Sequence, residues 1–69
     1  MTALTVVVNG APREVPAGAS VADVVAAVAA SAAGVAAALN GEVVRRADWA
    51  ATPLRDADRL EVLTAVQGG

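Results

Sequence analysis

Cysteine and histidine are both missing from this 69-residue chain. Without cysteine, disulfide bonds, a thiolate nucleophile and cysteine-based metal sites are excluded. Without histidine, the commonest general base and metal ligand is excluded too. The hydroxyl side chains have neither histidine nor lysine to activate them: Thr2, Thr5, Ser20, Ser31, Thr52 and Thr64. The sequence therefore predicts a protein that is not an enzyme, with no catalytic residues and no bound metal or cofactor.

Positive charge and aromatic side chains are also scarce. The chain has five arginines, no lysine, a single aromatic residue in Trp49 and a formal net charge of −2. A basic patch with interleaved aromatic side chains is the usual signature of nucleic-acid binding, so we expect no nucleic-acid partner. The chain also has no lysine side chain to accept an isopeptide bond.

A long uncharged stretch covers residues 24–41 and is long enough to cross a membrane. Much of it is alanine, which is a weak lipid anchor, and Ser31, Gly34 and Asn40 interrupt it. The first residues lack the basic start of a secretory signal. We therefore expect no membrane association and a cytoplasmic location.

The N-terminal part of the chain reads as a β-hairpin. Residues 4–8 are rich in β-branched side chains and end at Asn9-Gly10, a strong hairpin signal. A second strand over residues 12–15 follows, and Pro12 suits an edge or strand-start position because it has no N–H to donate. The residues predicted to face the core are Leu4, Val6 and Val8.

A helix is predicted over residues 21–30. Ser20 and Asp23 form a helix-start pattern in which the hydroxyl caps free N–H groups and the carboxylate favours the positive end of the helix. Gly34 is the expected exit point. The apolar side chains recur at helical spacing: Val21, Val24, Val25 and Val28.

The C-terminal half contains a second hairpin and a last strand. Residues 35–39 and 42–44 flank another Asn-Gly pair at 40–41. Residues 47–49 form a short helical turn, and residues 59–66 form the last strand. In that strand Leu60 and Val62 share one face, and Glu61, Leu63 and Ala65 share the other.

This order of elements indicates a single small α+β domain. We predict a mixed sheet of four to five strands covered on one face by one helix, with residues 1–66 as the domain and residues 67–69 as a flexible tail. One helix leaves the other sheet face uncovered, and exposed apolar patches often mark partner sites. The predicted partner-binding apolar face consists of Val7, Leu63, Ala65 and Val66.

The sequence ends Gln67-Gly68-Gly69. A Gly-Gly ending can be a frayed terminus or a cloning remnant. After a strand, however, three extended residues reach about 10 Å, and glycines can thread a narrow channel because they have no Cβ. The tip then presents a carboxylate, which is a poor electrophile. Activation by ATP followed by attack of a sulfur nucleophile would have to come from partners, since the chain has neither a thiol nor a phosphate-binding loop.

Four segments together resemble the ThiS family of ubiquitin-like sulfur carriers. They are Val6-Val7-Val8-Asn9-Gly10, Asn40-Gly41-Glu42-Val43-Val44, Arg46-Ala47-Asp48-Trp49 and the closing Gly68-Gly69. The resemblance covers essentially the whole chain. Gly-Gly alone is weakly specific, but its combination with the length, the Asn-Gly-Glu-Val hairpin and the Arg-x-x-Trp segment is far more so.

The resemblance implies a ubiquitin-like β-grasp fold and a role in thiamine biosynthesis. It implies that a ThiF-like adenylyltransferase uses ATP to adenylate Gly69. It also implies that a sulfur donor protein, a cysteine desulfurase or similar, converts Gly69 to a C-terminal thiocarboxylate. A ThiG-like thiazole synthase would then receive the sulfur, with Gly68 and Gln67 threading the partner active sites.

One segment departs from the family pattern. The family commonly has Asp-Gly-Asp before the last strand, and this chain has Asp56-Ala57-Asp58. If that turn requires a positive φ, alanine costs roughly 1 kcal/mol there. The departure concerns the shape of the turn, not the chemistry of the tail.

Other conspicuous residues have structural interpretations that compete with functional ones. Trp49 is expected to close the open end of a small core, although tryptophan also anchors interfaces. Arg45 and Arg46 are expected to be solvated, with contact to acidic partner groups as the alternative. Asp56 and Asp58 are expected to shape a turn and not to bind metal.

Four other functions stay open at this point. A MoaD-like carrier for molybdopterin synthesis is the nearest, although such chains tend to be longer and to lack the Arg-x-x-Trp segment. A ubiquitin-like protein modifier would end in an isopeptide bond. A binding module with an inert tail would not need Gly68 and Gly69. A catalytic domain ranks last because histidine and cysteine are missing.

Overall fold

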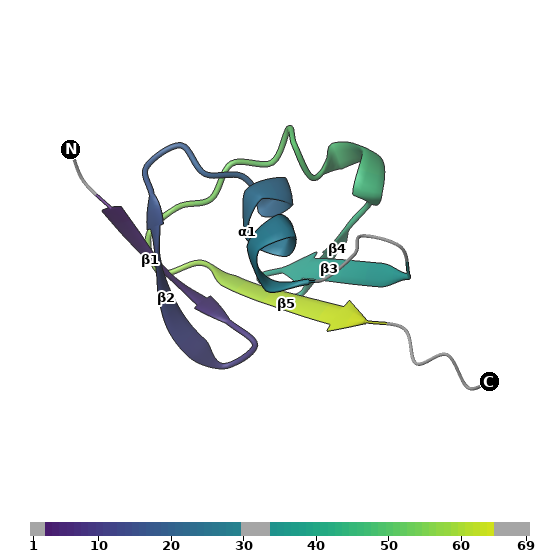
Figure 1. The fold of residues 1–69 in the computed structure, drawn as a ribbon, viewed down its shortest axis with the longest axis horizontal. Helices are drawn as coiled ribbons and strands as arrows, with labels where there is room; N and C mark the ends of the chain where they lie inside the picture. Colours follow the sequence, from purple (N-terminus) through teal and green to yellow (C-terminus); the bar gives the residue numbers. More distant parts are fainter. Residues whose placement is uncertain (1–2, 30–33, 65–69) are drawn as a thin grey trace.

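The computed structural model describes residues 3–29 and 34–64, which form a mixed five-stranded sheet with one α-helix (Figure 1). The sheet order is β2-β1-β5-β3-β4. This is the predicted α+β, β-grasp architecture. The elements are β1 (Ala3–Val8), β2 (Ala11–Pro16), α1 (Val21–Val28), β3 (Val35–Leu39), β4 (Glu42–Val44), the 3-10 helix η1 (Arg46–Asp48) and β5 (Arg59–Thr64).

Both Asn-Gly pairs form the predicted hairpin turns. Asn9 and Gly10 have φ angles of 51° and 84°, and Asn40 and Gly41 have 52° and 86°. Two successive left-handed residues are what a two-residue hairpin loop needs, and asparagine and glycine tolerate them best. The turns join β1 to β2 and β3 to β4 in antiparallel register.

Strand β5 lies at the centre of the sheet. It runs parallel to β1, with Val8 beside Leu60, and antiparallel to β3, with Leu39 beside the same Leu60. The predicted strand over residues 12–15 is longer at both ends, and Pro12 lies on an edge strand as expected. The strand that carries the C-terminal residues is thus paired on both sides.

Helix α1 begins as the sequence predicts. The Ser20 hydroxyl accepts a hydrogen bond from the Asp23 N–H at 3.3 Å, and the Asp23 carboxylate accepts one from the Ser20 N–H at 2.9 Å. This reciprocal pair is a capping box. The helix ends at Val28, earlier than predicted, because Ala29 turns to an extended conformation with φ −112° and ψ 139°.

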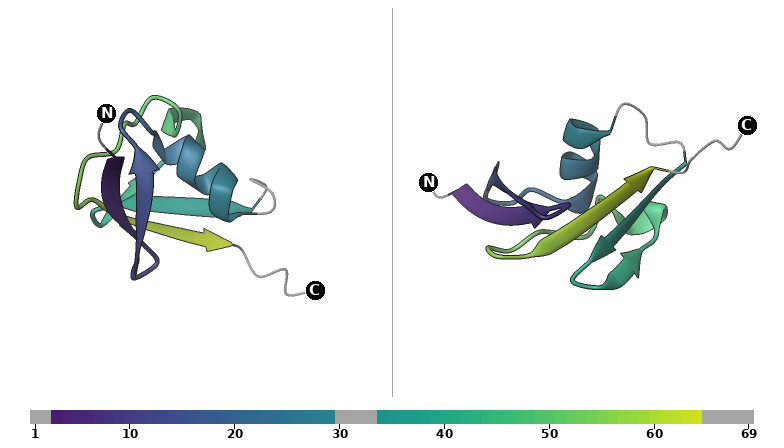
Figure 2. Two further views of the ribbon diagram at one scale, coloured as in Figure 1. Left: turned by 60° about the vertical axis from the view of Figure 1, so that its left-hand side comes forward. Right: turned by 90° about the horizontal axis from the view of Figure 1, so that it is seen from below.

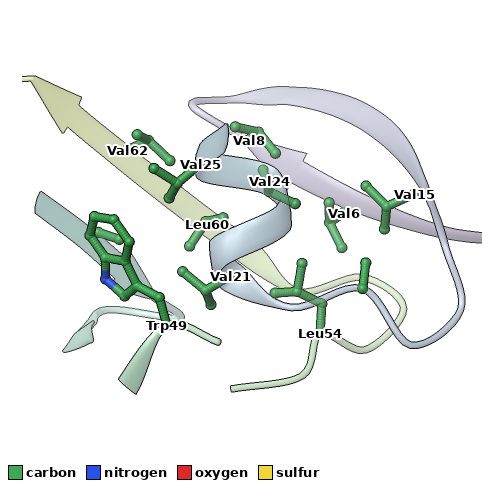
Figure 3. Close-up of a cluster of buried hydrophobic side chains, with 12 residues drawn as sticks. Val6, Val8, Val15, Val21, Val24, Val25, Trp49, Leu54, Leu60 and Val62 are labelled. Atoms are coloured by element: carbon green, nitrogen blue, oxygen red, sulfur yellow. The ribbon is translucent and has the colours of Figure 1, made fainter. Parts of the chain in front are cut away.

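The core lies between helix α1 and one face of the sheet (Figure 3). Burial of each valine or leucine there contributes about 1.5–3 kcal/mol relative to exposure. Leu4 is partly buried and Val28 is 38% exposed, so the predicted core stripes are correct except at their ends. The largest fully buried side chains among the described residues are Leu60, Val6, Val21 and Val24.

Trp49 follows η1 and closes one end of this core, as predicted (Figure 3). It is 5% exposed, and its indole N–H donates to the Val44 carbonyl at 2.8 Å. The Trp49 carbonyl accepts from the Ala22 N–H at 3.2 Å. Because the indole fills the core and its polar atom is bonded, the structural interpretation of Trp49 is confirmed.

Ala57 adopts a left-handed conformation with φ 71°. The turn is therefore one that favours glycine, as the departure from the family pattern suggested. It is held by neighbouring bonds: the Asp56 carboxylate accepts from the Thr5 N–H at 2.8 Å, and the Ala57 N–H donates to the Thr5 carbonyl at 2.8 Å. These contacts fix the turn despite the alanine.

The proposed tail lies outside the described residues. So do Ala65 and Val66, the predicted last residues of the final strand, and the expected domain boundary between residues 66 and 67. Within residues 3–29 and 34–64, no helix is long and apolar enough to span a membrane.

Candidate functional site

The candidate site has two parts: the C-terminal residues and the sheet face beside the strand that leads to them. Strand β5 is described to Thr64, and the predicted site residues Ala65, Val66, Gln67, Gly68 and Gly69 lie beyond it. Their predicted roles therefore stay predictions. The described part of the site consists of β5 and its neighbours.

Helix α1 covers one face of the sheet, and none of the other described elements covers the opposite face (Figure 2). We call this opposite side the open face. Val7 and Leu63, the described members of the predicted partner-binding face, both point to it, because side chains alternate along a strand and the neighbours Val6, Val8 and Val62 lie in the core. Val7 is half-buried, whereas Leu63 is 63% exposed.

Charged residues separate Val7 from Leu63 on the open face. Val7 lies beside Arg59, and Glu61 comes between Arg59 and Leu63 along β5. One positive and one negative side chain therefore lie between these two members of the predicted apolar face. Val7, Arg59 and Glu61 line a shallow hollow whose rim includes the glycines of both hairpin turns.

Leu63 instead belongs to an apolar row that runs across β3 towards β4. Ala36 is its partner on β3, and Ala38 lies opposite Val43 on β4. Val43 is 78% exposed and was not among the predicted site residues. Part of the signal was present, because the two-residue turn at 40–41 fixes the hairpin register and places Val43 on the same face as Ala38. The pairing of β3 with β5, which joins this face to Leu63, is not specified by the turn.

The two aspartates before β5 both accept hydrogen bonds that hold the turn. The Asp58 carboxylate accepts from the Arg55 N–H at 2.8 Å and from the Asn40 side-chain amide at 3.0 Å. Asp56 is bonded to β1 as described above. This arrangement is a bonded turn, as predicted, and the described residues contain no group of three potential metal-ligating side chains.

Arg45 and Arg46 are exposed at the start of η1, where Arg45 precedes the helix and Arg46 is its first residue. Exposure agrees with the expectation that they are solvated and leaves them accessible to a partner. Neither residue lies on β5, the strand that carries Leu63. Their contact with an acidic partner stays a prediction.

Comparisons with known proteins give one consistent result. The ThiS family model matches residues 6–69. The solved structure of a thiamine biosynthesis protein (ThiS) from Geobacter metallireducens is similar, with 35% sequence identity and a TM-score of 0.80. That alignment covers 96% of this chain and 100% of the other. No curated protein sequence matches.

Proposed function

The chain belongs to the ThiS family, and from this premise we propose that it is a sulfur carrier for thiamine biosynthesis. The working group is the C-terminal carboxylate of Gly69. The protein acts as a co-substrate of its partner enzymes and supplies no catalytic side chain. A cytoplasmic location goes with this function, because ATP is consumed in the activation step.

The observation that carries the proposal is the extent of the family match. The match runs to residue 69, so the Gly68-Gly69 ending lies inside the region that is shared with the family. A cloning remnant would lie outside it. We therefore infer that the Gly68-Gly69 ending belongs to the family pattern and carries the chemistry of the sulfur carrier.

The chemistry proceeds in three substitutions. A carboxylate oxygen of Gly69 attacks the α-phosphorus of ATP in a ThiF-like adenylyltransferase, and pyrophosphate leaves. The outer sulfur of a cysteine persulfide on a donor protein, such as a cysteine desulfurase, then attacks the carbonyl carbon and AMP leaves, which joins the two proteins through an acyl disulfide. A partner thiol attacks the donor's cysteine sulfur and forms a disulfide with it, the bond to the outer sulfur breaks, and Gly69 is released as the C-terminal thiocarboxylate, whose sulfur goes to a ThiG-like thiazole synthase. Gly68 and Gln67 thread the partner active sites, and at position 68 the lack of a Cβ suits a narrow channel.

The open face supplies the docking surface in this proposal. Leu63 and Val43 are large apolar side chains that are 63% and 78% exposed, and exposed apolar groups of this kind mark interaction sites. Leu63 lies next to the last described residue of β5. A partner that covers Leu63 is thereby brought close to the start of the C-terminal segment. Val7, Ala65 and Val66 complete the proposed face.

Restoration of growth in a thiamine-requiring bacterial strain that lacks its own sulfur carrier tests this function. We expect the wild-type chain to restore growth without added thiazole. A variant with one residue added after Gly69 should fold but should not restore growth, because its reactive carboxylate is displaced. Growth on the extended chain with the extension still attached would contradict the proposal. Equal growth with Gly68 and Gly69 deleted would favour an inert tail.

A further inference from the structure

We propose that the side chain of Asn9 is a positioning residue for the C-terminal segment. It holds the end of β5, the strand from which the chain continues into the C-terminal segment. This inference rests on the proposed sulfur-carrier function. It concerns a residue of the first hairpin, more than fifty positions before β5 ends.

The main-chain pairing between β1 and β5 ends before β5 does. The Val7 N–H donates to the Asp58 carbonyl at 2.8 Å, and the Asn9 N–H donates to the Leu60 carbonyl at 3.0 Å. At Asn9 the chain turns into the hairpin with φ 51°. The main chain of β1 therefore does not continue alongside Val62.

The Asn9 side chain continues the pairing where the main chain stops. Its Oδ1 accepts a hydrogen bond from the Val62 N–H at 2.8 Å, and its Nδ2 donates to the Val62 carbonyl at 3.2 Å. An amide side chain carries the same acceptor and donor as a peptide group. Asn9 thus takes the place of one strand residue and satisfies both backbone groups of Val62, which is 7% exposed.

Only Leu63 and Thr64 follow Val62 before the described part of β5 ends. On its other side β5 is paired with β3 as far as Thr64, which lies opposite Val35. The Asn9 amide therefore supplies the last described hydrogen bonds on the β1 side of β5. Its loss would leave the end of this strand paired on one side only.

The position of the strand end matters because the reacting carboxylate lies five residues beyond Thr64. A strand end that is paired on one side only frays more readily, which lengthens the segment that must be ordered when the carboxylate enters a partner site. Each added degree of freedom lowers the fraction of bound carriers whose carboxylate is in reacting geometry, and so lowers the rate of the step. Leu63 keeps its pairing with Ala36 of β3 when the Asn9 amide is lost, so docking through the open face is retained. We therefore expect loss of this amide to lower kcat for tail activation and to leave KM for the carrier nearly unchanged.

Asn40 provides a matched control. It occupies the same left-handed position in the other Asn-Gly turn, and its amide also makes two bonds, to Asp58 at 3.0 Å and from the Arg59 N–H at 3.0 Å. These bonds hold the beginning of β5, not its end. Glycine at either position tolerates the turn, so Asn9→Gly and Asn40→Gly each remove two bonds without straining the hairpin.

The experiment measures ATP-dependent activation by the cognate adenylyltransferase at a temperature where circular dichroism shows every variant to be folded. We expect kcat for Asn9→Gly to fall on the order of tenfold, a modest loss for a mispositioned reacting group. The kcat for Asn40→Gly should stay near the wild-type value. Wild-type kcat for Asn9→Gly, or an equal fall in both variants, would overturn the inference while the proposed function stands. A wild-type chain that is not activated would overturn both.

Amide hydrogen exchange in the wild-type protein gives a test that needs no variant to fold. The Val62 amide should exchange as slowly as that of Leu60, because both are held on the β1 side of β5. Exchange of Val62 at the rate of an exposed amide would also overturn the proposal. In Asn9→Gly the Val62 amide should exchange faster while that of Arg59 does not.

Discussion

At the scale of the residue, Ala57 shows how a neighbouring network holds an unfavourable conformation. Its φ of 71° lies in the left-handed region, which costs roughly 1–2 kcal/mol for a residue with a Cβ. The turn is retained because Asp56 and Ala57 are both bonded to Thr5 on β1. From the sequence, alanine at this position is unfavourable only if the turn requires a positive φ. The φ angle of Ala57 shows that it does.

Ala57→Gly should therefore stabilise the protein. Relief of the left-handed strain exceeds the extra freedom that glycine gives the unfolded chain, so we expect a net gain of about 0.5–1 kcal/mol. Urea unfolding followed by circular dichroism measures it. Ala26→Gly is the control, because Ala26 is exposed on helix α1 and should lose about 0.5–1 kcal/mol. A loss of stability at both positions would contradict the strain at Ala57.

Trp49 is the largest single contributor to one end of the core. Removal of a buried tryptophan side chain typically costs about 3–5 kcal/mol, a large share of the stability of so small a domain. We expect Trp49→Ala to be largely unfolded at 37 °C in a circular dichroism melt. A melting temperature for Trp49→Ala within a few degrees of the wild type would show that the indole is not part of the core.

At the scale of the element, the outer edge of β2 is protected by its prolines. The backbone N–H groups of Thr5 and Val7 donate to the segment before β5 and therefore point away from β2. In an antiparallel pair the opposite residues then also point their backbone groups away, so those of Glu14 and Pro12 face outward. By the same alternation Pro16 also faces outward. Two of the three outward positions therefore have no N–H to donate, and proline on an edge strand discourages pairing with another chain.

Replacement of both prolines should open this edge. We expect Pro12→Val with Pro16→Val to associate with itself, measured as a concentration-dependent increase in mass by light scattering after size-exclusion chromatography. Ala11→Val is the control, because Ala11 pairs with Val8 and turns its backbone groups inward. A monomeric double variant at high concentration would show that another feature closes the edge.

Most elements could be predicted because each is specified locally. Asn-Gly pairs set the two hairpins, and Ser20 with Asp23 sets the start of α1. The end of α1 could not be predicted, since Ala29 and Ala30 favour a helix and nothing in the local sequence requires Ala29 to be extended. The bond between Asn9 and Val62 also escaped sequence analysis, because it joins positions 53 residues apart.

At the scale of the whole molecule, the single helix leaves one sheet face for partners. Alternation along β5 predicted that Leu63 lies on this face and Val62 in the core, and both placements are confirmed. The pairing of β5 with β1 on one side and with β3 on the other, together with the pairing of β3 with β4, determines which side chains join Leu63 there. It brings Arg59 beside Val7 and Val43 into the same apolar row.

Leu63→Ser should weaken partner recognition without unfolding the protein. Substitution of an exposed side chain usually changes stability by no more than about 0.5 kcal/mol, so thermal unfolding should be nearly unchanged. We expect KM for the activating enzyme to rise, because the docking surface loses its large apolar side chain. Val28→Ser is the control, since Val28 is also partly exposed but lies on helix α1. Equal effects of the two substitutions on KM would contradict docking through the open face.

The central claim is that the carboxylate of Gly69 is the group on which this protein carries sulfur. Intact-protein mass spectrometry tests it directly, on the wild-type chain incubated with its cognate adenylyltransferase, ATP and a sulfur source. We predict a species in which sulfur replaces one oxygen, with fragmentation placing the change at Gly69 and with no such species when ATP is omitted. A chain of unchanged mass under the complete conditions, with an enzyme shown to be active on another carrier, would contradict the account.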